Sequence, residues 1–479
     1  MSRAYRNSHS LHHSGKNPRF WLALILLEAV LIRLGLYLYV SPKPLKLFTP
    51  DSFGYDQLAT NILRYGVFSA GSQPPFTPDL ERTPAYPAMI AAVYAAAGHS
   101  PEAVILLQML LAALTVGLTF CLARRIGVSN WVALLAAGLV AAEPVSAMTS
   151  DLLLTETLFT LLLAAGTLLL LLYWRSSQLC WLLLSAVILG LAALTRPVSQ
   201  FLPIAILPVV VAMGRYMGWR RATLAALLFL GVSMGITYSW ALRNYQAGGL
   251  FTLSTVADTN LVYYRAREVQ ADVDGTSQED ALHKLEARVA QLAASGGASA
   301  AERGALERQV ALDIFRRYPA QTFAMLAKGA ARIFVDPGFS TTCILLDRSS
   351  TSMECFQGQA TMDEPGVLGK VVGRFTQMNR LQQVILIWSI LISAAIYLGA
   401  TFGEFLLLRE RKWLPALLLI VVVGYLVIVS AGAEAYSRFR IPIVPFLSVL
   451  AAVGLGGIWG QLLKTPGERS RASAIERAS

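Results

Sequence analysis

The sequence predicts an all-α polytopic membrane protein with about ten transmembrane helices, and three observations favour this fold class. Of the 479 residues, 55% are hydrophobic and only 14% are charged, whereas a soluble protein carries about a quarter charged residues. The hydrophobic residues gather in runs of about 20, the length of a helix that crosses a bilayer. Lysine and arginine recur in every second short connection between these runs, as they do in cytoplasmic loops.

The apolar runs place the expected spans along the chain. The first follows a polar and basic N-terminal arm, and its length favours a retained membrane span over the core of a cleavable signal peptide. No internal repeat is visible, which weakens the case for an inverted-repeat transporter fold. The expected spans cover residues 20–40, 102–123, 131–148, 153–173, 179–195, 198–214, 222–241, 382–402, 413–431 and 440–460.

The distribution of positive charge indicates the orientation. An even number of spans puts both termini on one side, and each short turn assigned to that side is basic. We therefore expect a multi-pass protein of the inner (plasma) membrane with both termini in the cytoplasm. This arrangement accounts for much of the net charge of +11, so nucleic acid is not an expected partner. The basic residues concerned are Arg3, Arg6, Lys16, Arg19, Arg124, Arg125, Arg175, Arg215, Arg220, Arg221, Arg409, Arg411, Lys412, Lys464, Arg469, Arg471 and Arg477.

Two expected outside segments are too long to be simple turns. The first, residues 41–101, contains an apolar stretch that is too short for a span and is typical of an interfacial helix. The second, residues 242–380, is the size of a small domain. The chain would thus consist of a cytoplasmic arm (1–19), a first transmembrane region (20–241), an extracytoplasmic domain (242–380), C-terminal transmembrane helices (381–462) and a cytoplasmic tail (463–479).

The second segment carries the signals of a mainly helical domain. Ser277 with Asp280, and Ser299 with Glu302, have the spacing of a helix cap followed by an acid three residues on. The second of these helices should end just before Pro319, and an amphipathic helix over 320–334 should rest on the bundle or the membrane surface.

Cysteine usage agrees with an outside location for this domain. Cys343 and Cys355 both fall within it, where oxidising conditions permit a disulfide. The alternative is a pair of free thiols, because the C-x11-C spacing does not match a zinc site.

Acidic residues mark the outer ends of several spans. Asp51, Tyr55 and Ala59 are four residues apart and share one face of a helix just beyond the first span. On spacing alone Asp51 is either a helix cap or a functional acid. Asp151 and Glu156 lie beside the fourth span and would point in different directions on a regular helix. Glu156 lies deeper, and it is either functional or a buried acid paired with an arginine such as Arg33 or Arg196.

Arginines are found on the same outer side. Several guanidinium groups beside carboxylates, just outside a bilayer, suggest recognition of a lipid phosphate. The alternative is interfacial snorkelling or simple pairing with acids. There is no P-loop, no nucleotide fingerprint and no zinc-protease motif, and the five histidines are scattered. The arginines are Arg82, Arg196, Arg243, Arg438 and Arg440.

Taken in order, these segments resemble the membrane glycosyltransferases of the GT-C class. The likeness is to family 39-like bacterial enzymes, relatives of the protein O-mannosyltransferases and of the lipid A aminoarabinose transferase. The segments that carry it run along most of the chain: R-L before the first loop, D-x3-Y-x3-A, E-R-T-P-A-Y-P, L-L-T-E-T-L-F, L-T-R-P, W-A-L-R-N-Y and R-F-R-I-P-I-V-P-F.

The resemblance implies an inverting transfer of a sugar from a polyprenyl-phosphate-linked donor to a hydroxyl of a lipid, glycan or protein. It implies that Asp51 is the general base and that Glu156 is the second family acid. Arg82 is similar to the basic residue of the family's E-K-P-P stretch, although Arg replaces Lys and Thr-Pro replaces Pro-Pro here. Arg82 and the other four arginines of this side, Arg196, Arg243, Arg438 and Arg440, would bind the donor phosphate. Residues expected to line the substrate are Tyr55, Glu81, Tyr86 and Asp151.

Three points stay open at this stage. A divalent metal ion is a possible cofactor, because some relatives use one and others do not. A transporter or flippase of lipid-linked sugars would share the spans and the arginines, although its site should lie near the bilayer midplane. A structural subunit of an envelope complex is a third reading, which no motif supports.

Overall fold

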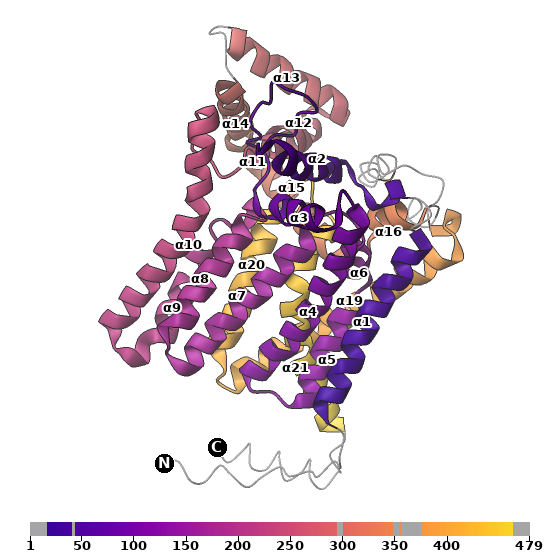
Figure 1. Ribbon diagram of the computed structural model, residues 1–479, viewed down its shortest axis with the longest axis vertical. Coiled ribbons are helices and arrows are strands. Elements are labelled where there is room, and N and C mark those ends of the chain that lie inside the picture. Colours follow the sequence, from indigo (N-terminus) through magenta and orange to yellow (C-terminus); the bar gives the residue numbers. More distant parts are fainter. Residues whose placement is uncertain are drawn as a thin grey trace.

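The computed structural model describes residues 17–40, 44–294, 300–347, 355, 373 and 375–462. These residues form helices and turns without any strand, as the composition predicted. A bundle of long apolar helices carries, at one end, a head of shorter helices (Figure 1). We call this end of the bundle the head end and the other the basal end.

Eight helical segments of the described chain are long and apolar enough to cross a membrane. Two of the eight begin with a 3₁₀ segment. The eight are α1 (Pro18–Val40), α4 (Pro101–Ile126), α7 (Glu156–Ser176), η2 with α9 (Pro197–Ser199 and Leu202–Gly214), α10 (Trp219–Gly248), α19 (Arg380–Arg409), α20 (Trp413–Ser430) and η6 with α21 (Ser437–Ile443 and Val444–Leu462).

The count of about ten expected spans differs from this because two of them are irregular. The third is broken into α5 (Asn130–Ala142) and α6 (Pro144–Ser150), bent by 57°. Glu143 causes the break: its Oε2 accepts from the Ser146 amide at 2.6 Å and caps a new helix that starts at Pro144. The fifth, α8 (Leu179–Ala193), has only 15 residues.

The bundle is closely packed where glycines allow it. A Cβ atom on Gly403 of α19 or on Gly454 of α21 would overlap backbone atoms of the other helix. Small residues let helix backbones approach in this way within membranes. The pair α19 and α21 therefore forms a rigid support under η6, which leads into α21.

The head contains the two segments predicted outside the spans. From the first loop come α2 (Pro50–Tyr65) and α3 (Ala85–Ala97), which lie at the head end of the bundle (Figure 1). From the second come the π-helical turn η4 and a series of short helices. Their bounds are α11 (Val256–Asn260), η4 (Leu261–Ala266), α12 (Arg267–Asp274), α13 (Gln278–Ala294), α14 (Ala300–Arg317), α15 (Pro319–Val335) and α16 (Phe339–Leu346).

The helix boundaries in the head follow the predicted signals. The Asp280 amide donates to Ser277 Oγ at 3.1 Å, so α13 begins where the cap predicts. Ser299 lies outside the described residues, but α14 ends at Arg317, just before Pro319. The amphipathic α15 packs against α20 and η6, which places it on the bundle as expected.

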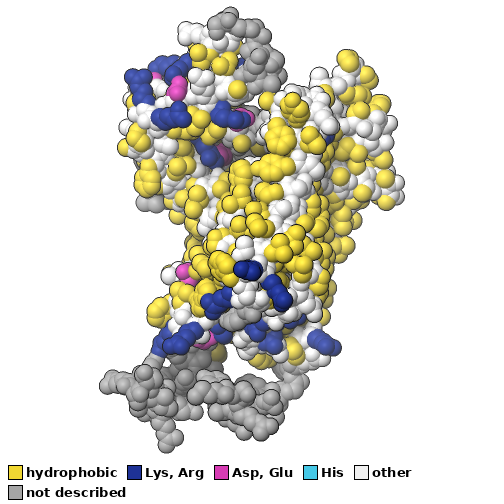
Figure 2. Space-filling view, turned by 90° about the vertical axis from the view of Figure 1, so that its left-hand side faces the viewer, with side chains coloured by type: hydrophobic (Ala, Val, Ile, Leu, Met, Phe, Trp, Pro, Cys, Tyr) yellow, Lys and Arg dark blue, Asp and Glu magenta, His cyan; other side chains and the backbone are white. Residues whose placement is uncertain are grey.

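Charged side chains on the surface gather at the two ends of the molecule. Figure 2 shows a broad hydrophobic band between lysine and arginine side chains at the basal end and a second charged region in the head. The basal helix ends and connections of the described chain carry Arg124, Arg125, Arg175, Arg215, Arg220, Arg221, Arg409, Arg411 and Lys412. The arm 1–16 and the tail 463–479 lie outside the described residues.

Candidate active site

Glu156 is the centre of a charged cluster at the head end. It is the first residue of α7, its side chain is fully buried, and its Oε1 accepts from the guanidinium groups of Arg196 and Arg438. Arg196 is held in extended backbone between the end of α8 and Pro197, a conformation that a following proline favours. Of the two pairing arginines considered from the sequence, the structure thus selects Arg196 and not Arg33.

Arg438 connects this buried acid to an exposed one. Its Nη1 lies 3.1 Å from Asp51 Oδ2, and the same nitrogen is 3.4 Å from the Tyr436 hydroxyl. The side chain of Asp51 is 52% exposed, whereas that of Arg438 is 11% exposed. One guanidinium therefore bridges a fully buried carboxylate and a carboxylate that solvent can reach.

The start of α2 leaves Asp51 free for such a contact. Thr49 is the N-cap, and its amide donates to Ser52 Oγ at 2.9 Å. Asp51 stands in the first turn, where a negative charge is favourable beside the helix N-terminus. Asp51 is therefore not the helix cap, which was the alternative for this residue.

Tyrosines support the same face of α2. The rings of Tyr55 and Tyr86 meet edge to face at 5.1 Å, and the fully buried Tyr86 donates to Gln108 Oε1 at 2.6 Å. Burial, together with the charge of Asp51, raises the pKa of Tyr55 to about 12. Tyr55 thus stays a neutral phenol near Asp51, and the Tyr86 ring packs against it.

The side chain of Arg82 packs against α2. Its guanidinium carbon is 5.7 Å from the centre of the Tyr55 ring, and a Cβ atom on Gly54 would come within 2.5 Å of it. Its ion pairs are with Asp79 at 3.4 Å and Glu81 at 3.5 Å. Glu81 is about half exposed, and partial burial raises its pKa. The missing side chain of Gly54 is what allows a cation to lie against the helix that carries Asp51.

Two predicted phosphate-binding arginines point elsewhere. Arg243 donates to the backbone oxygens of Asp79 at 2.8 Å and Phe68 at 3.3 Å and stacks on Phe68 and Trp240. Arg440 is 1% exposed and pairs with the equally buried Glu143 at 3.2 Å. In the described chain, neither guanidinium contacts Glu156 or Asp51.

Asp151, expected to line the substrate, is also outside the cluster. It ends α6 and is fully buried, five residues before Glu156. It lies near the buried Arg33 of α1. The break between α6 and α7 turns the two acids to different surroundings, as their spacing suggested.

The structure adds residues that sequence reasoning did not select. Gly54 was visible as a glycine inside a helix, an unfavourable position that usually has a packing reason. The Asp79 carboxylate forms an ion pair with Arg82, and its backbone carbonyl accepts a hydrogen bond from Arg243. Gln108 Oε1 accepts a hydrogen bond from the Tyr86 hydroxyl. The Gln108 amide nitrogen donates to the carbonyls of Ser150 and Leu152, at 2.9 and 2.8 Å. Asp79 and Gln108 had no signal in their sequence context.

Cysteines and potential metal ligands complete the inventory. Cys343 and Cys355 form a disulfide in the head, which excludes the free thiols. No three His, Cys, Asp or Glu side chains of the described residues are placed to hold a metal ion together.

Comparisons with known proteins agree with this architecture. The chain has the fold of the archaeal oligosaccharyltransferase AglB of Archaeoglobus fulgidus, solved with an inhibitory peptide and a dolichol-phosphate: TM-score 0.53, 15% identity, 96% of this chain and 52% of that one. The apo form of the Archaeoglobus fulgidus oligosaccharyltransferase gives a TM-score of 0.52 and 13% identity, over 95% of this chain and 52% of that one. The chain thus spans about half the length of these proteins. No curated protein matches its sequence.

The architecture is thus that of a polytopic membrane protein with the fold of the archaeal oligosaccharyltransferase. Within it, residues 81–240 match the family described as dolichyl-phosphate-mannose-protein mannosyltransferase. The matched stretch includes Arg82, Glu156 and Arg196, whereas Asp51 and Arg438 lie outside it.

Proposed function

We propose that this protein transfers a sugar from a polyprenyl-phosphate-linked donor to a hydroxyl group of a lipid, glycan or protein. The observation that carries the proposal is the position of Arg438, which joins the exposed Asp51 to the buried pair of Glu156 and Arg196. A solvent-accessible carboxylate beside fixed cations, at the head end of several spans, suits an acceptor hydroxyl that reaches it from the aqueous side and a donor held in the lipid. The dolichol-phosphate bound by the similar AglB structure supports a donor of this kind.

In this proposal the arginines stabilise the leaving phosphate. Cleavage of the glycosyl–phosphate bond leaves negative charge on the lipid phosphate, and preorganised cations lower the energy of that transition state. Arg196 and Arg438 contact Glu156, Arg438 also contacts Asp51, and Arg82 lies against the helix that carries Asp51. Their guanidinium groups stay charged at any physiological pH.

Asp51 is assigned as the general base. The acceptor hydroxyl must lose a proton as its oxygen attacks the anomeric carbon, and an accessible carboxylate within hydrogen-bond distance can take it. The attack and the departure of the lipid phosphate would occur in one displacement, which inverts the sugar linkage. Glu156 cannot serve in the same way while it is buried and holds two arginines, so we assign it to positioning them.

Arg243 and Arg440 receive structural roles. Arg243 fastens the loop before Arg82 to α10, and Arg440 neutralises Glu143 inside the bundle. We place the head and the cluster on the extracytoplasmic side, because the basal connections are the basic ones. A transporter remains the rival, but it would need a site near the bilayer midplane rather than at one end.

The test is transfer of radiolabelled sugar from a crude lipid-linked donor fraction by purified wild type, Asp51→Asn and Asp51→Glu. We expect Asp51→Asn to lose at least about a hundredfold in rate, the usual contribution of a general base, with partial activity in Asp51→Glu. Folding is checked by thermal unfolding, and Asp56→Asn on the same helix is the control. Near-normal transfer by Asp51→Asn would remove its assignment, and a wild type that moves labelled lipid across vesicles without transfer would favour the transporter.

A further inference from the structure

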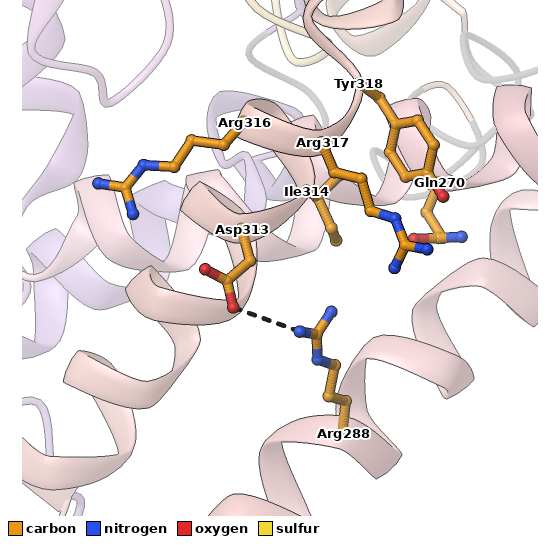
Figure 3. A pocket seen from close by; sticks show the side chains of 7 residues that line it. All are labelled: Gln270, Arg288, Asp313, Ile314, Arg316, Arg317 and Tyr318. Carbon is orange, nitrogen blue, oxygen red and sulfur yellow. Dashed lines mark hydrogen bonds and ion pairs between the residues drawn. The ribbon is translucent and has the colours of Figure 1, made fainter.

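The head contains a cavity of about 550 Å³ that the proposed reaction does not use. It opens between α12, α13, the end of α14 and the residue before α15 (Figure 3). Three of its seven lining residues are arginines and one is an acid. The lining consists of Gln270, Arg288, Asp313, Ile314, Arg316, Arg317 and Tyr318.

Positive charge in this cavity is only partly neutralised. Asp313 pairs with Arg288 at 3.2 Å, and both side chains are about half exposed. Arg317 stacks over Tyr318 at 5.7 Å, and no carboxylate of the described residues pairs with it. In Figure 3 the side chains of Arg288 and Arg317 extend toward one space that Gln270 and Tyr318 also border, whereas Arg316 points away.

This arrangement suits one chemical class of ligand. Two guanidinium groups directed at one space repel each other, and an anion between them removes the repulsion while accepting paired hydrogen bonds. Phosphate and carboxylate groups have the matching geometry. Gln270 and the Tyr318 ring would contact the uncharged body of the ligand, since amide and aromatic groups bind sugar-like surfaces by hydrogen bonds and stacking.

The cavity is also connected to the candidate active site through helices of the head. Tyr318 leads directly into α15, which packs against η6, the segment that contains Arg438. Gln270 belongs to α12, which continues η4, and Arg265 of η4 pairs with Glu434 at 2.6 Å. A ligand here would contact α12 and the N-cap of α15, which continue directly into the elements that hold the loop before Arg438.

We propose that this cavity binds an anionic group, phosphate or carboxylate, of the glycosyl acceptor. The proposal rests on the proposed function, because it assigns a substrate class to the same enzyme. The competing explanation is purely structural: Arg288 and Asp313 tie α13 to α14, and the cavity binds nothing.

Calorimetric titration of the purified full chain, in an uncharged detergent, with inorganic phosphate distinguishes the two. We expect Arg317→Gln and Arg288→Gln each to weaken phosphate binding about tenfold, the effect of removing one charged hydrogen bond. Arg303→Gln is the matched control, because Arg303 lies on the same helix, pairs with Glu307 and is outside the cavity. Equal phosphate binding by wild type and Arg317→Gln, or no binding by wild type, would overturn the site.

Competition then identifies the source of the anion. Displacement of phosphate by glucose 6-phosphate would indicate a soluble acidic glycan. Displacement by nanodiscs of phosphatidylglycerol, but not of phosphatidylcholine, would indicate a lipid headgroup. Either result supports an anionic acceptor, and failure of both would overturn it.

Transfer kinetics separate this inference from the proposed function. With a crude acceptor fraction titrated at fixed donor, Arg317→Gln should need about tenfold more acceptor for half-maximal rate. The dependence on donor should not change. If the acceptor dependence is normal although phosphate binding is lost, the acceptor role is wrong and the transferase stands. If wild type binds phosphate but transfers no sugar, the proposed function fails and the acceptor role with it.

Discussion

At the scale of single residues, one carboxylate oxygen of Glu156 receives two guanidinium groups in a fully buried position. Burial of a charge is costly unless it is paired, so removal of the acid leaves two cations in a poorly solvated place. The same pairing fixes the directions of Arg196 and Arg438. Stability and activity should therefore respond together when Glu156 changes.

We expect Glu156→Gln to lower the free energy of unfolding by about 3–5 kcal/mol, the usual cost of breaking a buried ion pair. Transfer should also fall, because the two arginines are no longer held. Thermal unfolding and initial rates measure the two effects. Glu81→Gln is the control: its pair with Arg82 is partly exposed to solvent and should be worth about 1 kcal/mol or less. A Glu156→Gln protein as stable as wild type would contradict the assigned positioning role.

Residue pairing is also where sequence reasoning reached its limit. The candidate residues were chosen from short motifs, but their partners lie 282 and 387 positions away, which no local pattern encodes. Arg438 and Arg440 looked equivalent because they are two residues apart. They lie in a 3₁₀ segment, where two residues turn by about 240°, so one meets Glu156 and the other Glu143.

At the scale of elements, α2 depends on an absent side chain. Gly54 lies under the Arg82 guanidinium, the movable end of a flexible side chain. An added methyl group can displace that end without disturbing the backbone. Alanine also favours a helix interior over glycine by about 0.5–1 kcal/mol, so the effects of a substitution on stability and on function should have opposite signs.

Gly54→Ala should thus keep or slightly raise the melting temperature while it weakens donor use several-fold, because Arg82 is pushed from its place beside Tyr55. Donor titration and thermal unfolding test this. Gly35→Ala in α1 is the matched control, since a Cβ atom there meets nothing within 4 Å. Unchanged donor dependence in Gly54→Ala would show that the position of Arg82 on α2 does not matter for the donor.

The segment before Arg438 is fastened by the head. Arg265 donates to Glu434 at 2.6 and 3.0 Å, Arg332 donates to the Ala433 carbonyl at 3.0 Å, and the Ser437 amide donates to Asp336 at 2.9 Å. Loops hold a side chain in place only when their backbone is fixed in this way. These residues of the head therefore help to position Arg438 even though they do not themselves contact Asp51 or Glu156.

Loss of the Arg265–Glu434 pair should lower the maximal rate about tenfold, the size expected for one charged hydrogen bond, with little change in donor dependence. Arg265→Gln, Glu434→Gln and the double variant form a cycle in which the two effects should not add. Arg308→Gln breaks a similar two-bond pair with Asp258 inside the head and is the control. Equal losses in Arg308→Gln and Arg265→Gln would mean that general loosening of the head is responsible.

The positions of the helices were predicted from the sequence more successfully than the pairing of residues. Hydrophobic runs located a helix at each expected span, and Ser277 and Pro319 marked helix boundaries in the head, because these signals are local in the chain. Two spans were mistaken in regularity. The break at Glu143–Pro144 depends on a cap, and α8 ends at Ala193, shortly before the extended Arg196. Apolar composition alone contains neither feature.

At the scale of the whole molecule, the separation of charge makes the orientation testable. Basic connections at the basal end and an apolar band above them favour a cytoplasmic basal end. The head, with α2 and the candidate active site, would then be outside. Arg64 of α2 and Arg220, in the first turn of α10, are exposed residues at the two ends.

We expect Arg64→Cys, in a protein whose Cys121 and Cys180 are replaced by serine, to react with a membrane-impermeant maleimide in intact bacterial cells. Arg220→Cys should react only after the membrane is permeabilised, because the bilayer separates it from the reagent. Labelling of both after permeabilisation is the control for reactivity. The opposite pattern would place α2 in the cytoplasm, and donor and acceptor would then have to be sought on that side. Since long outside segments are exempt from the charge rule, the arginines of the head cannot by themselves reverse the orientation that the basal connections favour.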